Sequence, residues 1–147
     1  MKRRSLSPLR LLLAGLAAVA MVLTTQVPAH AEPTSQSVWV EWLYSNGVEA
    51  GRGQFQADPF GSEPGDALRA CDFNADGYGI EVRMMINPST SPSSWRTDRM
   101  ASTRGINSPY CTPWATGNLT EGTFVGVKIC LVKGTFSDCK APEYGWA

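Results

Sequence analysis

One segment of the chain has the spacing of a calcium-binding loop. Asp72, Asn74 and Asp76 alternate with other residues up to a glycine, which matches the opening D-x-[DN]-x-[DN]-G of such loops. Alternating oxygen side chains allow the backbone to wrap around a hard cation. The twelfth position, where a bidentate carboxylate is required, is Arg83. We therefore favour a hairpin turn in which the three side chains cap backbone amides and Gly77 takes a positive φ, and we expect no cofactor.

Aromatic side chains form the second group with a chemical use. The five tryptophans are Trp39, Trp42, Trp95, Trp114 and Trp146. Flat aromatic faces on a β-sandwich stack against sugars and also anchor protein interfaces, whereas one or two such rings can simply fill a core. Trp39 and Trp42 are an odd number of positions apart, so a regular strand must point them to opposite faces. Trp95, Trp114 and Trp146 lie in or near predicted loops and are the tryptophans that we expect to be exposed.

The first 31 residues read as a secretory signal peptide. They have a basic start, an apolar block of 13 residues at 11–23 and an Ala-His-Ala end. The block is shorter than the ~20 residues that a membrane-spanning helix needs. Cleavage would leave residues 32–147, which we expect to form a single secreted domain that is monomeric and free of the membrane.

Removal of this leader changes the charge and the available chemistry. The remaining 116 residues carry 9 Lys and Arg against 13 Asp and Glu, a net charge of −4. The single histidine, His30, leaves with the leader, which excludes Ser-His-Asp and Cys-His catalysis and histidine metal ligands. An acidic balance without a basic cluster argues against nucleic acid and anionic membranes as partners.

Paired carboxylates are the remaining route to catalysis, because they hydrolyse glycosides without histidine. The candidates are scattered and no pair stands out: Glu41, Glu49, Asp58, Glu63, Asp66, Glu81, Asp98 and Glu121. A small carboxylate-based hydrolase is therefore a distant alternative, and we expect no enzymatic activity.

Short segments with apolar alternation predict the elements that position these groups. Strands are expected at 38–44, 66–73, 79–86, 95–103 and 123–133, with a further extended segment starting at residue 54. Turn residues separate them, and no stretch shows a helical stripe. The pattern predicts an all-β fold, a single antiparallel β-sandwich or small barrel.

Four cysteines remain after the leader: Cys71, Cys111, Cys130 and Cys139. An even number in an exported chain indicates two disulfides, for which three connectivities are possible. We favour Cys71–Cys111 and Cys130–Cys139, because the second closes a short loop across a glycine. Alternation places Cys71 and Cys130 on the outer sides of their strands. We therefore expect both bridges at the surface or at an edge of the fold, and not between the two layers.

The weakly patterned region 87–110 offers a different kind of site. A long polar segment on a small disulfide-tied scaffold can present a rigid peptide to an enzyme. Trp95, Arg96 and Arg99 lie in it, and Trp114 follows it. These four residues are the candidate binding surface.

The segment Cys-Asp-Phe-Asn-Ala-Asp-Gly at 71–77, with Glu-Gly-Thr at 121–123 before the strand that ends in Cys130, resembles small secreted two-disulfide proteins of actinobacterial type. The resemblance covers about residues 50–140 and implies a shared β fold without a particular activity. The chain is also similar in size and cysteine count to exported subtilisin and α-amylase inhibitors. The Trp-Arg-Tyr triplet of the amylase inhibitors is absent, because Trp95-Arg96 is followed by Thr97.

These observations favour recognition over catalysis. We expect a secreted, non-catalytic binding protein, either an inhibitor or a protein-interaction module. The alternative is a carbohydrate-binding module that uses exposed tryptophan. The expected partner is accordingly an extracellular protein or polysaccharide.

Overall fold

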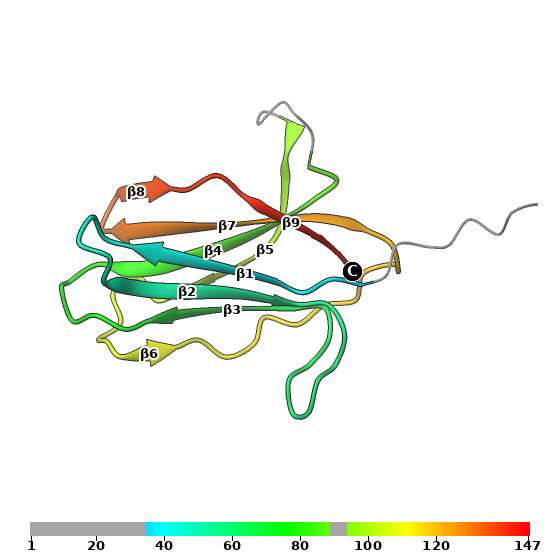
Figure 1. Ribbon diagram of the computed structural model, residues 1–147, viewed down its shortest axis with the longest axis horizontal. Coiled ribbons are helices and arrows are strands. Elements are labelled where there is room, and N and C mark those ends of the chain that lie inside the picture. Colours follow the sequence, from blue (N-terminus) through cyan, green and yellow to red (C-terminus); the bar gives the residue numbers. More distant parts are fainter. Residues whose placement is uncertain (1–34, 89–93) are drawn as a thin grey trace, which may run out of the picture. The chain divides into compact units, whose positions relative to one another are not determined.

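Nine strands form two antiparallel sheets within the residues that the structure, a computed structural model, describes, 35–88 and 94–147 (Figure 1). The strands are β1 Val38–Leu43, β2 Glu49–Gln56, β3 Ala67–Asp72, β4 Gly79–Ile86, β5 Arg96–Ser102, β6 Tyr110–Cys111, β7 Phe124–Lys133, β8 Phe136–Cys139 and β9 Glu143–Trp146. No α-helix occurs in this part of the chain. The predicted all-β sandwich is confirmed.

The two sheets form the two layers of the sandwich. The first has the order β1-β2-β3-β6, and the second has the order β5-β4-β7-β8. β9 also pairs with β7, along residues 124–127, whereas β8 pairs along residues 130–133. The chain therefore crosses between the layers after β3, after β5 and after β6.

The expected strands are present, and three short ones were not anticipated. β6, β8 and β9 have two to four residues each, too few for a period-two pattern to be recognised. The predicted leader and residues 89–93 of the expected polar loop lie outside the described residues. No helix in the described part is long and apolar enough to cross a membrane.

Alternating side chains of both sheets meet in one core. β1 contributes Val38, Val40 and Trp42, while β4 and β7 contribute the inward series that their alternation predicted: Ile80, Val82, Met84, Val125, Val127 and Ile129. Opposite them β2 turns two glycines inward, and the side chain of Val82 reaches into the space beside Gly53. A Cβ built on Gly53 would lie 2.5 Å from Val82 Cγ2, so the sheets pack too closely there for any side chain.

Both predicted disulfides are present, Cys71–Cys111 and Cys130–Cys139. Each joins residues that are directly paired in register, and each ties a short edge strand, β6 or β8, to its neighbour. The expectation that the bridges lie at sheet edges and do not join the two layers is confirmed. Cys71 and Cys130 are themselves buried.

One carboxylate is buried on the outer face of the second sheet. The side chain of Glu81 is only 4% exposed and forms ion pairs with Arg83 and, at 3.4 Å, with Arg104. Arg104 also donates to the backbone carbonyl of Phe136, 3.2 Å away. Arg104 thus links Glu81 on β4 to the first residue of β8, whereas Arg83 pairs with Glu81 within β4.

Candidate binding face

The four residues of the predicted binding surface are divided between the two sheets. Trp95, Arg96 and Arg99 lie at or within β5, whereas the ring of Trp114 lies 4.4 Å from the guanidinium carbon of Arg69 on β3. Arg96 is exposed, but the Arg99 side chain is only 12% exposed and forms an ion pair with Asp98. Residues 96–102 of the region 87–110 form β5, an edge strand paired with β4, in agreement with the strand expected at 95–103.

The expectation that Trp95, Trp114 and Trp146 are the exposed tryptophans is wrong. All three are half-buried, since Trp95 lies beneath Lys128 and Trp146 packs on Phe124 at 4.6 Å between ring centroids. The most exposed tryptophan in the described part of the chain is Trp39, at 51%. Trp42 is buried, so the opposite orientations predicted for Trp39 and Trp42 are confirmed.

The calcium-like segment forms a hydrogen-bonded turn. Asp72 Oδ1 accepts from the Asn74 amide at 3.1 Å, and Asp76 Oδ1 accepts from the Tyr78 amide at 2.9 Å. Gly77 has a φ of +77°. Asn74 differs from the expectation, because its side chain donates to the Glu49 carbonyl. In the described ranges no group of three or more His, Cys, Asp or Glu side chains could hold a metal ion.

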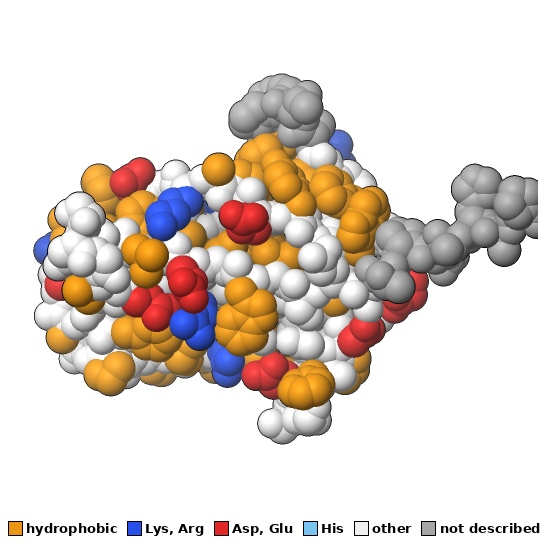
Figure 2. All heavy atoms as spheres, in the orientation of Figure 1, with side chains coloured by type: hydrophobic (Ala, Val, Ile, Leu, Met, Phe, Trp, Pro, Cys, Tyr) orange, Lys and Arg blue, Asp and Glu red, His pale blue; other side chains and the backbone are white. Residues whose placement is uncertain are grey.

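A larger candidate site covers the outer face of the first sheet. The strand register places Trp39 beside Gln54, and Gln54 beside Arg69, in a row across β1, β2 and β3. We call this surface the Trp39 face; its members are Trp39, Glu41, Glu49, Arg52, Gln54, Gln56, Phe60, Glu63, Arg69 and Phe73. Figure 2 shows charged side chains gathered over β1–β3, with hydrophobic side chains beside them.

Local sequence explains why β2 supplies the middle of this face. Its inward positions are Gly51, Gly53 and Phe55, so its outward positions are Arg52, Gln54 and Gln56. Because glycine has no apolar side chain, the inward positions 51 and 53 show no apolar alternation, and sequence reasoning did not identify the start of this strand. The polar residues at the alternate positions 52, 54 and 56 are the signal that would have identified it.

Hydrogen bonds hold the floor of the face in place. Gln54 Nε2 donates to Gln56 Oε1 at 3.0 Å and to Glu63 Oε2 at 3.2 Å. Gln54 Oε1 in turn accepts from Arg69 Nη2 at 3.1 Å. Because Gln54 is only 2% exposed, it acts as the anchor of this network, while Glu63 and Arg69 remain about one third exposed.

The charges on the face are paired with one another. Arg52 forms ion pairs with Glu41 and with Glu49, each at 3.1 Å, and Arg69 forms one with Glu63 at 3.6 Å. The guanidinium carbon of Arg52 also lies 5.6 Å from the centre of the Trp39 ring. Two guanidinium and three carboxylate groups therefore stand at fixed positions around the exposed indole, and each of these guanidinium groups has a carboxylate partner.

Two hollows flank Trp39 and Gln54, and both residues line both hollows. One has about 260 Å³ and extends past Arg52 and Arg69 to Phe73. The other has about 630 Å³ and extends past Gln56 to Phe60, on the loop 57–66 that projects from the sheet between β2 and β3 (Figure 1). The face is thus a shallow trough with an indole at its middle and an exposed phenyl ring at each end.

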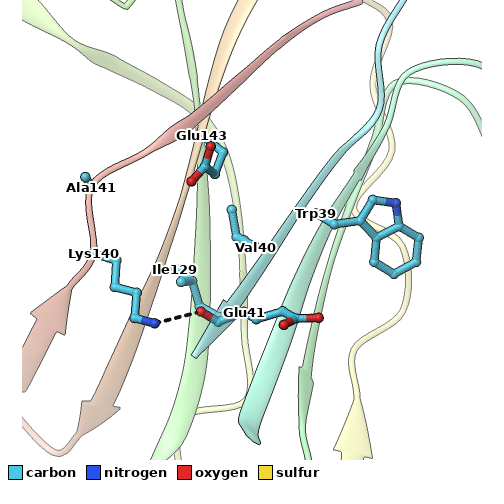
Figure 3. A pocket seen from close by; sticks show the side chains of 7 residues that line it. All are labelled: Trp39, Val40, Glu41, Ile129, Lys140, Ala141 and Glu143. Atoms are coloured by element: carbon cyan, nitrogen blue, oxygen red, sulfur yellow. Dashed lines mark hydrogen bonds between the residues drawn. The ribbon is translucent and has the colours of Figure 1, made fainter. Parts of the chain in front are cut away.

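A third hollow, of about 280 Å³, opens on the other side of β1. Figure 3 shows Lys140 reaching across it to the backbone of Glu41, whose carbonyl accepts from Lys140 Nζ at 3.0 Å. The side chains of Trp39 and Glu41 point away from Lys140 in this view. The Lys140 ammonium group is thus held by a backbone carbonyl of β1.

Comparison with protein-family models, with curated proteins and with solved structures gives no match. The function of the Trp39 face must therefore be inferred from its geometry.

Proposed function

We propose that this chain is a secreted, non-catalytic binding domain that recognises saccharides through the Trp39 face. The observation that carries the proposal is the half-exposed indole of Trp39, which stands between two hollows and is surrounded by ordered guanidinium and carboxylate groups. The two disulfides are consistent with an oxidising compartment outside the cytoplasm.

A sugar ring requires this combination of groups. Its C–H face is apolar and stacks on a flat aromatic ring, and its hydroxyl groups both donate and accept hydrogen bonds. The carboxylates of Glu41, Glu49 and Glu63 accept such bonds, and the guanidinium groups of Arg52 and Arg69 donate them. Because internal contacts already orient these side chains, little conformational entropy is lost when a ligand binds.

The same charges make a protein partner the weaker candidate. The buried cores of protein interfaces are depleted of charged residues, particularly glutamate. Here three glutamates and two arginines surround the exposed tryptophan. A protein seated on this face would have to desolvate all of them, whereas a saccharide satisfies them with hydroxyl groups.

The arrangement of acidic groups supports binding without hydrolysis. Glycoside hydrolysis needs two carboxyl groups on either side of the scissile bond, with space between them for water or the sugar. Glu41 and Glu49 are instead bound to one guanidinium, that of Arg52. All cysteines in the described ranges are in disulfides, so no thiol there can act as a nucleophile.

The proposal is tested by affinity electrophoresis and calorimetry against soluble polysaccharides: β-glucan, xylan, mannan, starch and polygalacturonate. We expect the wild-type protein to bind at least one, and Trp39→Ala to weaken that binding by tenfold or more, about 1.4 kcal/mol. The matched control is Phe136→Ala, because Phe136 is 50% exposed on the opposite sheet. It should bind like the wild type.

Circular dichroism and thermal melting must show that Trp39→Ala remains folded, which its exposure predicts. The proposal fails if no polysaccharide binds, or if the variant binds as tightly as the wild type. Capture of a protein from culture medium by the wild type but not by Trp39→Ala would favour the interface alternative.

A further inference from the structure

We infer that the ligand of the Trp39 face is an extended, uncharged saccharide chain that lies along the strands, crosses Trp39 and places sugar units in both hollows. This inference rests on the proposed saccharide-binding function. It adds the direction of the ligand, its minimum length and its charge.

The direction follows from the order of the groups along the trough. Arg52 and Phe73 line the hollow on one side of Trp39, and Gln56 and Phe60 line the hollow on the other. The path from Arg52 to Gln56 runs along β2 itself. A chain seated on Trp39 therefore extends parallel to the strands, from one hollow into the other.

The length follows from the dimensions of this path. Arg52 and Gln56 are four residues apart on one strand, which corresponds to ~13 Å at ~3.3 Å per residue. Phe60 extends the trough beyond this point. A single sugar ring stacked on Trp39 would leave both hollows empty, so short saccharides should use only part of the site.

Phe60 is displayed to solvent by a rigid turn. Its amide donates to the Glu63 carbonyl at 3.0 Å, and the Glu63 amide donates back to the Phe60 carbonyl at 2.9 Å. The ring is nevertheless 74% exposed, more than any other large hydrophobic side chain in the described part of the chain. Exposure of a phenyl ring on an ordered turn costs free energy in water, and a second stacking position for the ligand would account for it.

The charge of the ligand follows from the pairing on the face. Each guanidinium there already has a carboxylate partner, namely Glu41 and Glu49 for Arg52 and Glu63 for Arg69. A uronate or phosphate group would have to break one of these pairs and approach the remaining carboxylates. Hydroxyl groups can bind to the same atoms without separating them, so a neutral chain is favoured.

The test is calorimetry with oligosaccharides, from disaccharide to hexasaccharide, of the neutral polysaccharide that the wild type binds. Polygalacturonate and a range of NaCl concentrations complete the experiment. We expect affinity to rise about tenfold or more from the disaccharide to the hexasaccharide. The affinity should change less than about twofold between low and high salt, because an uncharged ligand neutralises no charge on the protein.

Phe60→Ala distinguishes an occupied hollow from an empty one. It should weaken hexasaccharide binding several-fold and leave disaccharide binding unchanged, whereas Phe136→Ala should alter neither. Melting temperature provides the folding control, because an exposed ring contributes little to stability.

The outcomes separate this inference from the proposed function. If no saccharide binds to the wild type, the function itself is wrong. If saccharides bind but disaccharide and hexasaccharide have equal affinity, or polygalacturonate binds best and is released by salt, only the extended neutral ligand is overturned. Equal loss of short and long ligands in Phe60→Ala would also contradict the placement of sugars in both hollows.

Discussion

Replacement of Gly53 by alanine should destabilise the domain through steric conflict between the two sheets. Gly53 lies on β2, is paired with Val40 on β1 and faces the core. Its φ is not in the left-handed region, so the backbone itself accepts an alanine. Any cost must therefore come from the space that the added methyl group would occupy.

The magnitude follows from the contacts that this methyl group would make. It would lie 2.5 and 2.8 Å from the two γ carbons of Val82 and 2.7 Å from Val40 Cγ2, all below the 3.0 Å that real contacts respect. Both valines are buried and β-branched, so neither can easily rotate away. Overpacking costs about 1–3 kcal/mol, and the lower chain entropy of alanine returns about 0.5–1 kcal/mol. The difference spans roughly 0–2.5 kcal/mol. Because three contacts fall below 3.0 Å, we expect a net loss of roughly 1–2 kcal/mol, which corresponds to a fall in melting temperature of roughly 4–8 °C.

A double-mutant cycle with Val82→Ala tests this explanation by urea denaturation. Val82→Ala alone should cost about 2–3 kcal/mol, because it leaves a cavity. In the double variant the new methyl group enters that cavity, so the total loss should be smaller than the sum by about 1 kcal/mol or more. Gly126→Ala on β7 is the control, since its Cβ would come no closer than 3.3 Å to any neighbour. Full stability of Gly53→Ala, or simple additivity in the double variant, would refute the reasoning.

Two further predictions concern the outer faces. Replacement of both cysteines of the Cys71–Cys111 bridge by serine should lower the free energy of unfolding by about 4 kcal/mol, and the same change at Cys130–Cys139 should lower it by about 3 kcal/mol. The first bridge costs more because it closes a loop of 40 positions, whereas the second closes one of 9. The reverse order in urea denaturation would contradict the loop-entropy argument. Glu81→Gln should lower the free energy of unfolding by about 1–3 kcal/mol, because it weakens the charged hydrogen bonds to Arg83 and Arg104, whose guanidinium groups stay partly solvated. An unchanged denaturation midpoint would show that this buried network adds nothing to stability.

Sequence reasoning succeeded where a pattern is local. The alternation of β4 and β7 predicted their inward residues, such as Val82 and Val127, because a strand with one buried face must repeat every second residue. It also placed Cys71 and Cys130 on outward positions, which led to the correct view of the bridges as links within each sheet.

It failed where neighbours distant in the sequence decide the exposure of a side chain. Trp95 and Trp114 follow or precede loops, which suggested exposure, but Lys128 and Arg69 from other strands lie over their rings. No local pattern encodes these contacts. The candidate site was therefore expected around β5, whereas the face with the most exposed tryptophan is on the first sheet.

The sequence by itself determined the fold class, the number of disulfides and the opposite orientations of Trp39 and Trp42, because they follow from period-two alternation, cysteine count and strand geometry. Strand register decided which cysteines pair. Only the tertiary structure decided that Trp39 faces solvent between two hollows and that Arg52 and Arg69 are neutralised beside it. The physical reason is that register brings together β1, β2, β3 and the loop 57–66, and a surface assembled from separate strands exists only after they have paired.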